Sequence, residues 1–434
     1  MIPLLFETPR GMDDLLPDEV RIKRRVEDVI REVYRLYGYE EVETPTVEYL
    51  SLFEAKSGEE IRHRMFRMVD AHGRTLVLRP EVTASIARLV ATKLARSPTP
   101  IRLGYIADCY RYDEPQWGRR RRFWHGGLEL FGSSDPMSDS EITLASLEVF
   151  RRLGIDRPWV RFGHVGIVRG ILTEEGLDEK TQDIFLTMLD RKMQEEAFQS
   201  TKSLIDADAE KTLRLLIQMR GGVEIFRRSW DLLSPWSSAL RANENFEEIV
   251  GMIRHIQPEL VFTVDYGFAR GLEYYTGFIF EQGVGGVDIS FNGGGRYDRL
   301  VSLFGGSDTP AVGCAIGITR LVTYLHRGTV EMEGGHPTVL LSVLSDGARA
   351  YALSAAESLR QSGIATIVDV TRKRIPDAIE LALKKHVRYL AVVGEREHEH
   401  GTITIRDLSE RRQTELTPAE AASYIKGGHP PHEK

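Results

Sequence analysis

A short segment rich in glycine and glutamate separates two parts of this chain that carry different hydrophobic patterns. The segment covers 331–336 and is followed by Pro337. Before it, short β-prone stretches are mixed with long helical ones, whereas after it buried-type strands alternate regularly with helices. Because a single hydrophobic core stops growing at about 250–300 residues, a chain of 434 residues is predicted to form more than one domain. We therefore expect two domains joined by a linker over 331–336.

The first domain, 1–330, is predicted to contain an antiparallel sheet. A helix is expected over 17–37, where apolar residues recur three and four apart and Gly38 follows. Strands of one sheet are expected at 39–42, 64–69, 75–78, 101–112, 123–131, 276–282, 287–291 and 311–316.

Between about 170 and 250 the pattern of the first domain becomes helical. Helices are expected over 181–197, 202–219 and 245–256. Because sheet-like segments lie on both sides, this stretch is interpreted as a helical insertion that divides the sheet domain in sequence.

The second domain, 337–427, has the pattern of a small α/β domain. Strands are expected at 339–343, 365–370 and 389–393, and helices at 347–362 and 376–387. The end of the chain, 428–434, has no apolar anchor and is expected to form a flexible tail.

Composition excludes several classes of protein. A content of 42% hydrophobic and 28% charged residues is typical of a globular protein and not of a disordered one. The apolar runs are far shorter than the roughly 18 residues of a membrane span, so no membrane partner is expected. Two cysteines, Cys109 and Cys314, cannot make a disulfide scaffold, and the first ten residues do not form a secretory leader, so a cytoplasmic location is expected. The net charge of −7 means that any nucleic acid must be bound by a local basic patch.

The common glycine-rich phosphate loops and zinc-ligand spacings are not found, so bound phosphate would have to be held by side chains. The densest candidate is the segment 111–129, where two strand-like ends flank a turn followed by four adjacent arginines at 119–122. Taken alone, such a run is as often a solvated basic loop as it is a binding site. Since guanidinium groups bind phosphate bidentately, the hairpin could also hold a nucleotide at its base and a polyanion at its tip.

Three further clusters lie at 270–277, 293–298 and 311–321. Taken singly, Tyr274 and Tyr275 are more typical of core aromatics, and the glycines at 293–295 are more typical of a turn. The last cluster, a small-residue strand that runs into a helix, is typical of ordinary strand–helix packing.

Together, and in this order, the motifs resemble those of histidyl-tRNA synthetases, a family of class II aminoacyl-tRNA synthetases, along nearly the whole chain. The matching segments are RGMDDLLPDE (10–19), GYEEVETP (38–45) as class II motif 1, LRPEVTA (78–84), motif 2 (111–132), SDPMSDSEI (134–142), RGLEYYTG (270–277), GGGRYD (293–298), motif 3 (311–321), VGERE (393–397) and TITIRDL (402–408). The resemblance implies an α+β fold: an antiparallel-sheet class II catalytic domain with a helical insertion, followed by a small α/β anticodon-binding domain.

The activity that the resemblance implies is the ATP-dependent attachment of histidine to tRNA(His) through a histidyl-adenylate intermediate. ATP would be a substrate, and Mg²⁺ would accompany it, with ligands that the motifs do not identify; no metal site is assigned to the protein. The partners would be histidine, ATP, tRNA(His) and a second copy of the chain, which would form a homodimer through motif 1 around Pro45.

Roles for individual residues follow from the same match. Arg111 and Arg270 are expected to be catalytic, contacting the α-phosphate from two sides. ATP contacts are expected from Arg111, Asp113, Arg270 and Arg320. Histidine contacts are expected from Glu81, Thr83, His125, Glu129, Tyr274 and Tyr275. Contacts with tRNA are expected from Arg119, Arg120, Arg121, Arg122, Arg372, Lys373 and Arg374.

Four positions depart from the family pattern. Asp113 stands where glutamate is usual and Glu273 where aspartate is usual, and both keep their charge. His125 replaces a glutamine, and it is kept as a substrate contact because a neutral imidazole can accept a hydrogen bond from an ammonium group. Thr319 replaces an acidic residue before the motif 3 arginine, and no role is assigned to it.

Two other functions are compatible with these motifs. A non-catalytic synthetase-like regulatory subunit of a histidine-biosynthesis ATP phosphoribosyltransferase would fit the departures at His125 and Thr319. The retained arginines and the C-terminal domain favour the synthetase. A class II synthetase for threonine or proline is the third possibility, since fold alone does not determine the substrate. Glu129 with Tyr275, and the lack of a zinc-ligand set, argue against it.

Overall fold

The computed structural model divides into two compact units, Met1–Val330 and Glu331–Lys434. The structure describes residues 6–54, 63–270, 274–287, 289–327, 338–371 and 374–427. The predicted linker at 331–336 and the predicted tail at 428–434 lie outside the described residues, as do Glu273, Arg372 and Lys373.

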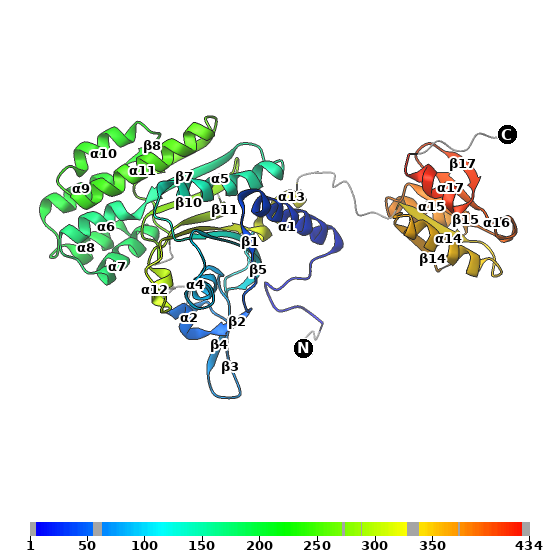
Figure 1. Ribbon diagram of the computed structural model, residues 1–434, viewed down its shortest axis with the longest axis horizontal. Coiled ribbons are helices and arrows are strands. Elements are labelled where there is room, and N and C mark those ends of the chain that lie inside the picture. Colours follow the sequence, from blue (N-terminus) through cyan, green and yellow to red (C-terminus); the bar gives the residue numbers. More distant parts are fainter. Residues whose placement is uncertain are drawn as a thin grey trace. The chain divides into compact units, whose positions relative to one another are not determined.

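The first unit is built on a large, mostly antiparallel sheet with the strand order β1-β5-β6-β12-β11-β10-β7-β9-β8 (Figure 1). The two pairs β1–β5 and β7–β9 are parallel. The strands are β1 (Glu40–Glu41), β5 (Ile101–Tyr110), β6 (Arg122–Phe131), β7 (Pro158–His164), β8 (Arg220–Gly221), β9 (Val261–Asp265), β10 (Phe278–Val284), β11 (Ser290–Arg296) and β12 (Ala311–Gly317). The predicted antiparallel sheet is confirmed.

Two predictions about this sheet are wrong. The segments predicted at 64–69 and 75–78 belong to a separate sheet with the order β2-β4-β3, formed by β2 (Val47–Tyr49), β4 (Thr75–Leu78) and β3 (Arg67–Val69). Alternation of apolar residues indicates a strand but does not identify its partner. The glycines at 293–295 are also not a turn, because they continue β11, which pairs with β10 on one side and β12 on the other.

Helices cover one face of the large sheet (Figure 1). They are α1 (Pro17–Tyr37), α5 (Pro136–Arg152), α11 (Ser237–Ile256) and α13 (Ile318–Arg327). The predicted helix over 17–37 is confirmed: proline stands in its first turn, and Gly38 ends it in the left-handed region at φ 74°. Glycine at 104 on β5 leaves the space for the Tyr34 ring, since a Cβ there would lie 2.7 Å from that ring. Helix α1 therefore packs closely on the sheet.

The helical insertion lies between β7 and β9, and its helices gather at one end of the sheet (Figure 1). Besides α11 it contains α6 (Val165–Glu174), α7 (Glu179–Asp190), α8 (Gln194–Thr201), α9 (Ala207–Leu216) and α10 (Ile225–Leu233). The single helix predicted over 181–197 is wrong, because the chain turns at Lys192, whose φ is 59°, and forms α7 and α8. The helix predicted from 202 begins only at Ala207, where the Asp206 side chain caps it.

Short helices complete the first unit: α2 (Leu50–Glu54), α4 (Thr83–Thr92) and α12 (Leu300–Leu303). Among the described residues, no helix combines the length and the apolar character needed to cross a membrane.

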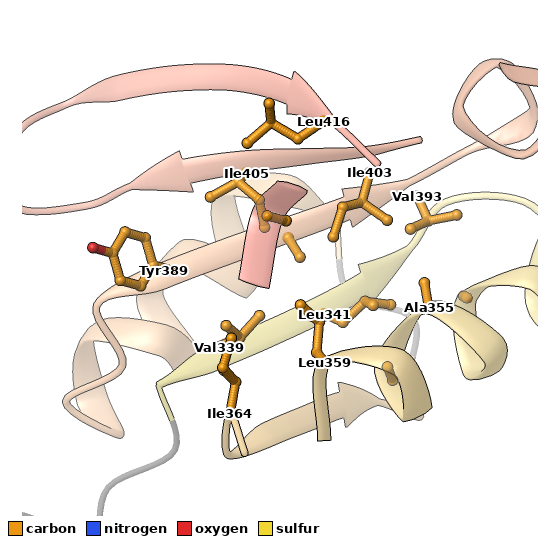
Figure 2. Close-up of a cluster of buried hydrophobic side chains, with 14 of the residues drawn as sticks. Val339, Leu341, Ala355, Leu359, Ile364, Tyr389, Val393, Ile403, Ile405 and Leu416 are labelled. Carbon is orange, nitrogen blue, oxygen red and sulfur yellow. The ribbon is translucent and has the colours of Figure 1, made fainter. Parts of the chain in front are cut away.

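The second unit has a sheet of order β14-β13-β15-β16-β17. Its elements are β13 (Val339–Val343), α14 (Arg349–Gln361), β14 (Thr366–Asp369), α15 (Ile375–Lys384), β15 (Tyr389–Val393), α16 (Glu395–His400), β16 (Ile403–Asp407), β17 (Arg412–Leu416) and α17 (Pro418–Ile425). Side chains of β13, β15 and β16 pack against Leu359 of α14 on one face (Figure 2), while α15 packs on the other. The predicted α/β pattern is confirmed, and the hairpin β16–β17 was not predicted.

Candidate active site

The sheet face opposite α1 carries a cavity of about 380 Å³. Glycines of the central strands form part of its floor. A Cβ at Gly313 would overlap with the carboxylate of Glu129, and a Cβ at Gly293 would overlap with the guanidinium of Arg270. These two glycines therefore provide the space in which the two charged side chains lie.

Arg111, Arg270 and Arg320 come from distant parts of the chain and all line this cavity. Arg111 follows β5, Arg270 follows β9, and Arg320 lies in the first turn of α13. Burial, together with the neighbouring positive charges of Arg119, Arg111 and Arg270, lowers the pKa of Arg320 to about 10. The cavity thus gathers guanidinium groups that repel one another and would be stabilised by an anion.

Backbone carbonyls hold these guanidinium groups in place. Arg111 Nε donates to Pro80 O at 2.8 Å, Arg270 Nη1 to Phe280 O at 2.9 Å, and Arg320 Nε to Gly118 O at 3.3 Å. Within the described residues, none of the three forms an ion pair with a carboxylate. Their charge is oriented but not neutralised, which suits the binding of phosphate groups.

Glu129 of β6 is completely buried and is hydrogen-bonded to two residues that line the cavity, Thr83 and Tyr297. One of its oxygens accepts a hydrogen bond from Thr83 Oγ1 at 2.7 Å, and the other accepts a short one from the Tyr297 hydroxyl. Burial raises the pKa of Glu129 to about 8, although these two donors act in the opposite direction. Tyr297 was not predicted as a site residue, although the cluster at 293–298 that contains it was recognised.

Glu81 is a second buried carboxyl group, and it lines the cavity itself. It accepts a hydrogen bond from the amide of Ala84 at 3.1 Å, at the start of α4. Burial raises the pKa of Glu81 to about 7, while that amide and the charge of Arg111 lower it. Glu81 therefore offers an acceptor for an N–H group of a cationic ligand, and Glu129 lies next to the lining residues Thr83 and Tyr297.

Aromatic rings form the walls around these carboxylates. Tyr274 and Tyr275 are both buried, line the cavity and have ring centroids 5.0 Å apart. The Tyr274 ring also lies 5.6 Å from that of Tyr297, in an edge-to-face arrangement. Apolar walls with a few oriented polar groups are typical of small-ligand sites.

His125 also lines the cavity, with its ring 4.9 Å from that of Phe123. Burial lowers the pKa of His125 to about 3, and the charges of Arg111 and Arg320 contribute. The imidazole is therefore neutral near pH 7 and keeps one nitrogen as an acceptor.

The arginine run at 119–122 does not form a free basic loop. Arg120 lies 3.3 Å from an Asp13 oxygen and 3.5 Å from a Glu19 oxygen, both in the N-terminal segment. The Arg121 guanidinium stacks on the Tyr112 ring at 3.9 Å. Arg120 therefore fastens the hairpin to the start of the chain, and Arg121 packs within the hairpin.

Further charged residues of the hairpin form ion pairs or line the cavity. Arg122 pairs with Asp108 at 3.1 Å, and Asp113 pairs with Arg64 at 3.2 Å. Arg119 lines the cavity and adds its positive charge to the site. In the second unit, Arg374 is 90% exposed, and its nearest carboxylate is that of Asp377 at 3.5 Å.

Comparisons with known proteins show the family of the chain. The family model described as Histidyl-tRNA synthetase matches residues 11–321, and the one described as Anticodon binding domain matches residues 338–427. This chain belongs to the histidyl-tRNA synthetase family. A curated histidine–tRNA ligase of Methanocaldococcus jannaschii is 32% identical over 407 residues, which cover 93% of this chain and 96% of that protein. The resemblance of the motifs to this family is thereby confirmed.

Solved structures of the family support the same fold. A Bacillus halodurans protein described as an ATP phosphoribosyltransferase regulatory subunit/histidyl-tRNA synthetase is 28% identical, with a TM-score of 0.76 over 90% of this chain and 98% of that one. The histidyl-tRNA synthetase of Nostoc sp. PCC 7120 is 22% identical and has the same fold, with a TM-score of 0.78 over 97% of this chain and 99% of that one. The predicted fold class is confirmed.

Proposed function

We propose that this member of the family is a histidine–tRNA ligase, which attaches histidine to tRNA(His) at the expense of ATP. The carboxylate of histidine attacks the α-phosphorus of ATP, giving histidyl-adenylate and pyrophosphate, and the histidyl group then passes to the terminal ribose of the tRNA. The observation that supports this most is that three guanidinium groups, which form no ion pair with a carboxylate among the described residues, line one cavity together with the buried Glu81.

The arginines would act by position and charge. Arg111 and Arg270 would contact the α-phosphate from two sides, and Arg320, with Arg119 beside it, would hold the outer phosphates. Asp113 completes the proposed ATP site, where its pairing with Arg64 orients it. Cations placed in advance where negative charge develops lower the barrier by a few kcal/mol each in a site from which water is excluded.

The buried carboxylates would select histidine. Glu129, held by Thr83 and Tyr297, would accept from an imidazole N–H, and Glu81 would face the α-ammonium group. An amino acid without that N–H would form one hydrogen bond fewer with Glu129, whose other partners are Thr83 and Tyr297, and such a loss costs about 0.5–1.5 kcal/mol. Tyr274, Tyr275 and His125 would complete the pocket.

Mg²⁺ would enter with the phosphates of ATP. In the part of the chain that the structure describes, no group of three or more His, Cys, Asp or Glu side chains could hold a metal ion. The described residues therefore do not fit a metal site made by the protein alone, and we assign no ligands to the ion.

The proposed macromolecular partners are tRNA(His) and a second copy of the chain. The anticodon would meet the second unit, with the predicted contacts at 372–374, and the acceptor end would approach the hairpin at 119–122. A homodimer would form around Pro45, which is exposed, and the exposure of Val47 (40%) and Tyr49 (46%) on the adjacent β2 supports an apolar contact there. The cytoplasm is the proposed location, because ATP and tRNA are found there.

The alternative is a non-catalytic regulatory subunit, and the printed description of the Bacillus halodurans protein includes that role for it. The arginines of the cavity, which pair with no carboxylate among the described residues, favour the ligase, because a site that only senses histidine has no use for several phosphate-binding groups.

Histidine-dependent exchange of pyrophosphate into ATP tests the proposal. We expect exchange that requires histidine and is not supported by threonine or proline. Folded protein that binds histidine but catalyses no exchange would support the regulatory subunit, and exchange with threonine or proline would support another class II synthetase.

A further inference from the structure

Thr319 connects two segments of the cavity that are far apart in the sequence. Strands β6 and β12 pair as far as His125 and Gly317, where β12 ends and α13 begins. Beyond this pair β12 offers no carbonyl to the next amide of β6, that of Trp124. The Thr319 Oγ1 accepts a hydrogen bond from this amide at 2.8 Å. The side chain thus replaces a backbone acceptor at the end of the sheet.

Both ends of this hydrogen bond lead directly into the proposed ATP site. On β6, Trp124 lies between Phe123 and His125, which line the cavity, and on α13 the residue after Thr319 is Arg320. Thr319 is 7% exposed, so the bond is shielded from water. This buried contact therefore adds to the β6–β12 pairing in holding the strand that carries His125 against the helix that carries Arg320.

The chemistry of the hydroxyl suits this place. A carboxylate at position 319, which is the usual type of residue in the family pattern, could also accept from the amide, but it would attract the guanidinium groups of the cavity. A threonine accepts the same hydrogen bond without a charge. Arg320 and Arg111 then remain available for phosphate, and they face a neutral imidazole at His125. The two strongest departures from the family pattern, at 125 and 319, thus lie on the two segments that this hydrogen bond connects.

We propose that Thr319 is a positioning residue for ATP, acting through Trp124 on His125 and through the start of α13 on Arg320. This inference rests on the proposed function, because it assumes that Arg320 contacts the nucleotide.

The test compares Thr319→Ala with Thr319→Ser, which differ by one oxygen atom. Thr323→Ala is the matched control, because the Thr323 hydroxyl bonds within α13, to Thr319 O at 2.8 Å. In histidine-dependent pyrophosphate exchange, we expect Thr319→Ala to lose about 10- to 100-fold in kcat/KM for ATP, as small misplacements of binding groups do. Thr319→Ser should stay within about threefold of the wild type, since its hydroxyl can accept the same hydrogen bond. The control should keep wild-type kinetics, and thermal unfolding should show that all variants are folded.

The inference is contradicted if Thr319→Ala keeps wild-type kinetics, if Thr319→Ser loses as much kcat/KM as Thr319→Ala, or if activity falls only in proportion to the amount of folded protein. Calorimetric titration with ATP in the absence of histidine separates this inference from the proposed function. If the wild type binds ATP but catalyses no exchange, the ligase proposal fails, and weaker ATP binding by Thr319→Ala than by Thr319→Ser still supports the positioning role. A wild type that binds no ATP overturns both.

Discussion

Tyr297 donates a hydrogen bond to Glu129, although the two residues lie 168 positions apart in the sequence. Tyr297 directly follows β11, and Glu129 lies on β6. Thr83 donates a hydrogen bond to the other oxygen of the carboxylate. The carboxylate is therefore oriented before any ligand arrives. A buried acceptor that is fixed in this way can discriminate between ligands by a single N–H group.

Removing the hydroxyl of Tyr297 should weaken histidine recognition. Tyr297→Phe keeps the ring that packs 6.2 Å from Phe131 but leaves Glu129 with one donor fewer. We expect KM for histidine to rise by about 10-fold to 100-fold, in line with about 1–3 kcal/mol for a buried polar group that loses a partner, and KM for ATP to change little. Exchange kinetics with each substrate varied in turn would measure this. Equal effects on both substrates would place Tyr297 outside the histidine site.

The stability of the free protein should fall as pH rises from about 6.5 to 8. Burial raises the pKa of Glu129 to about 8 and that of Glu81 to about 7. Above the ordinary carboxyl pKa the unfolded chain has already released these protons while the folded protein still holds them, so the folded state binds more protons and loses stability as pH increases. Thermal unfolding across this window would measure the slope.

Glu129→Gln is the control for this pH dependence, because an amide does not titrate. The variant should show a shallower slope of stability against pH. Its kcat/KM for histidine should also fall by the equivalent of a few kcal/mol of transition-state stabilisation, with a smaller effect on kcat/KM for ATP. An unchanged slope would mean that Glu129 is ionised in the free protein.

Adding a methyl group to the floor of the cavity should impair catalysis without unfolding the sheet. In Gly293→Ala the new Cβ would overlap with the guanidinium of Arg270, which must then move. We expect kcat to fall about 100-fold, since misplacement of a catalytic group by about 1 Å has effects of that size. Gly251→Ala on α11 is the matched control, because a Cβ there meets nothing within 4 Å. Wild-type exchange by Gly293→Ala would show that Arg270 is not required at that place.

The exposed Arg374 tests the proposed contact between the second unit and tRNA. Arg374→Glu should weaken tRNA binding and reduce the slope of log affinity against log salt by about 1, if one phosphate contact is lost. Arg412→Glu on β17 serves as the control, since Arg412 is also exposed but lies outside the predicted segment. Filter binding over a range of salt concentrations would measure both slopes, and identical slopes would exclude Arg374 from the interface.

Local signals in the sequence were sufficient for much of the fold. The extent of α1 follows from Pro17, Gly38 and the spacing of Val26, Val29 and Val33, because these residues act on the backbone within one or two turns. The strands at 75–78 and 339–343 were predicted for the same reason. The order of the motifs was sufficient for the family, since each motif reflects a local stretch of chain.

Contacts between distant segments decided the rest. The glycines at 293–295 are a turn signal by composition, and only their pairing with β10 and β12 makes them a strand. Arg120 and Arg121 belong to a basic run in the sequence, yet Asp13 and the Tyr112 ring engage them in the folded chain. Composition and periodicity report which conformation and which face a residue prefers. They do not report which remote donor, acceptor or charge will meet it, because burial and hydrogen bonding depend on the whole tertiary arrangement.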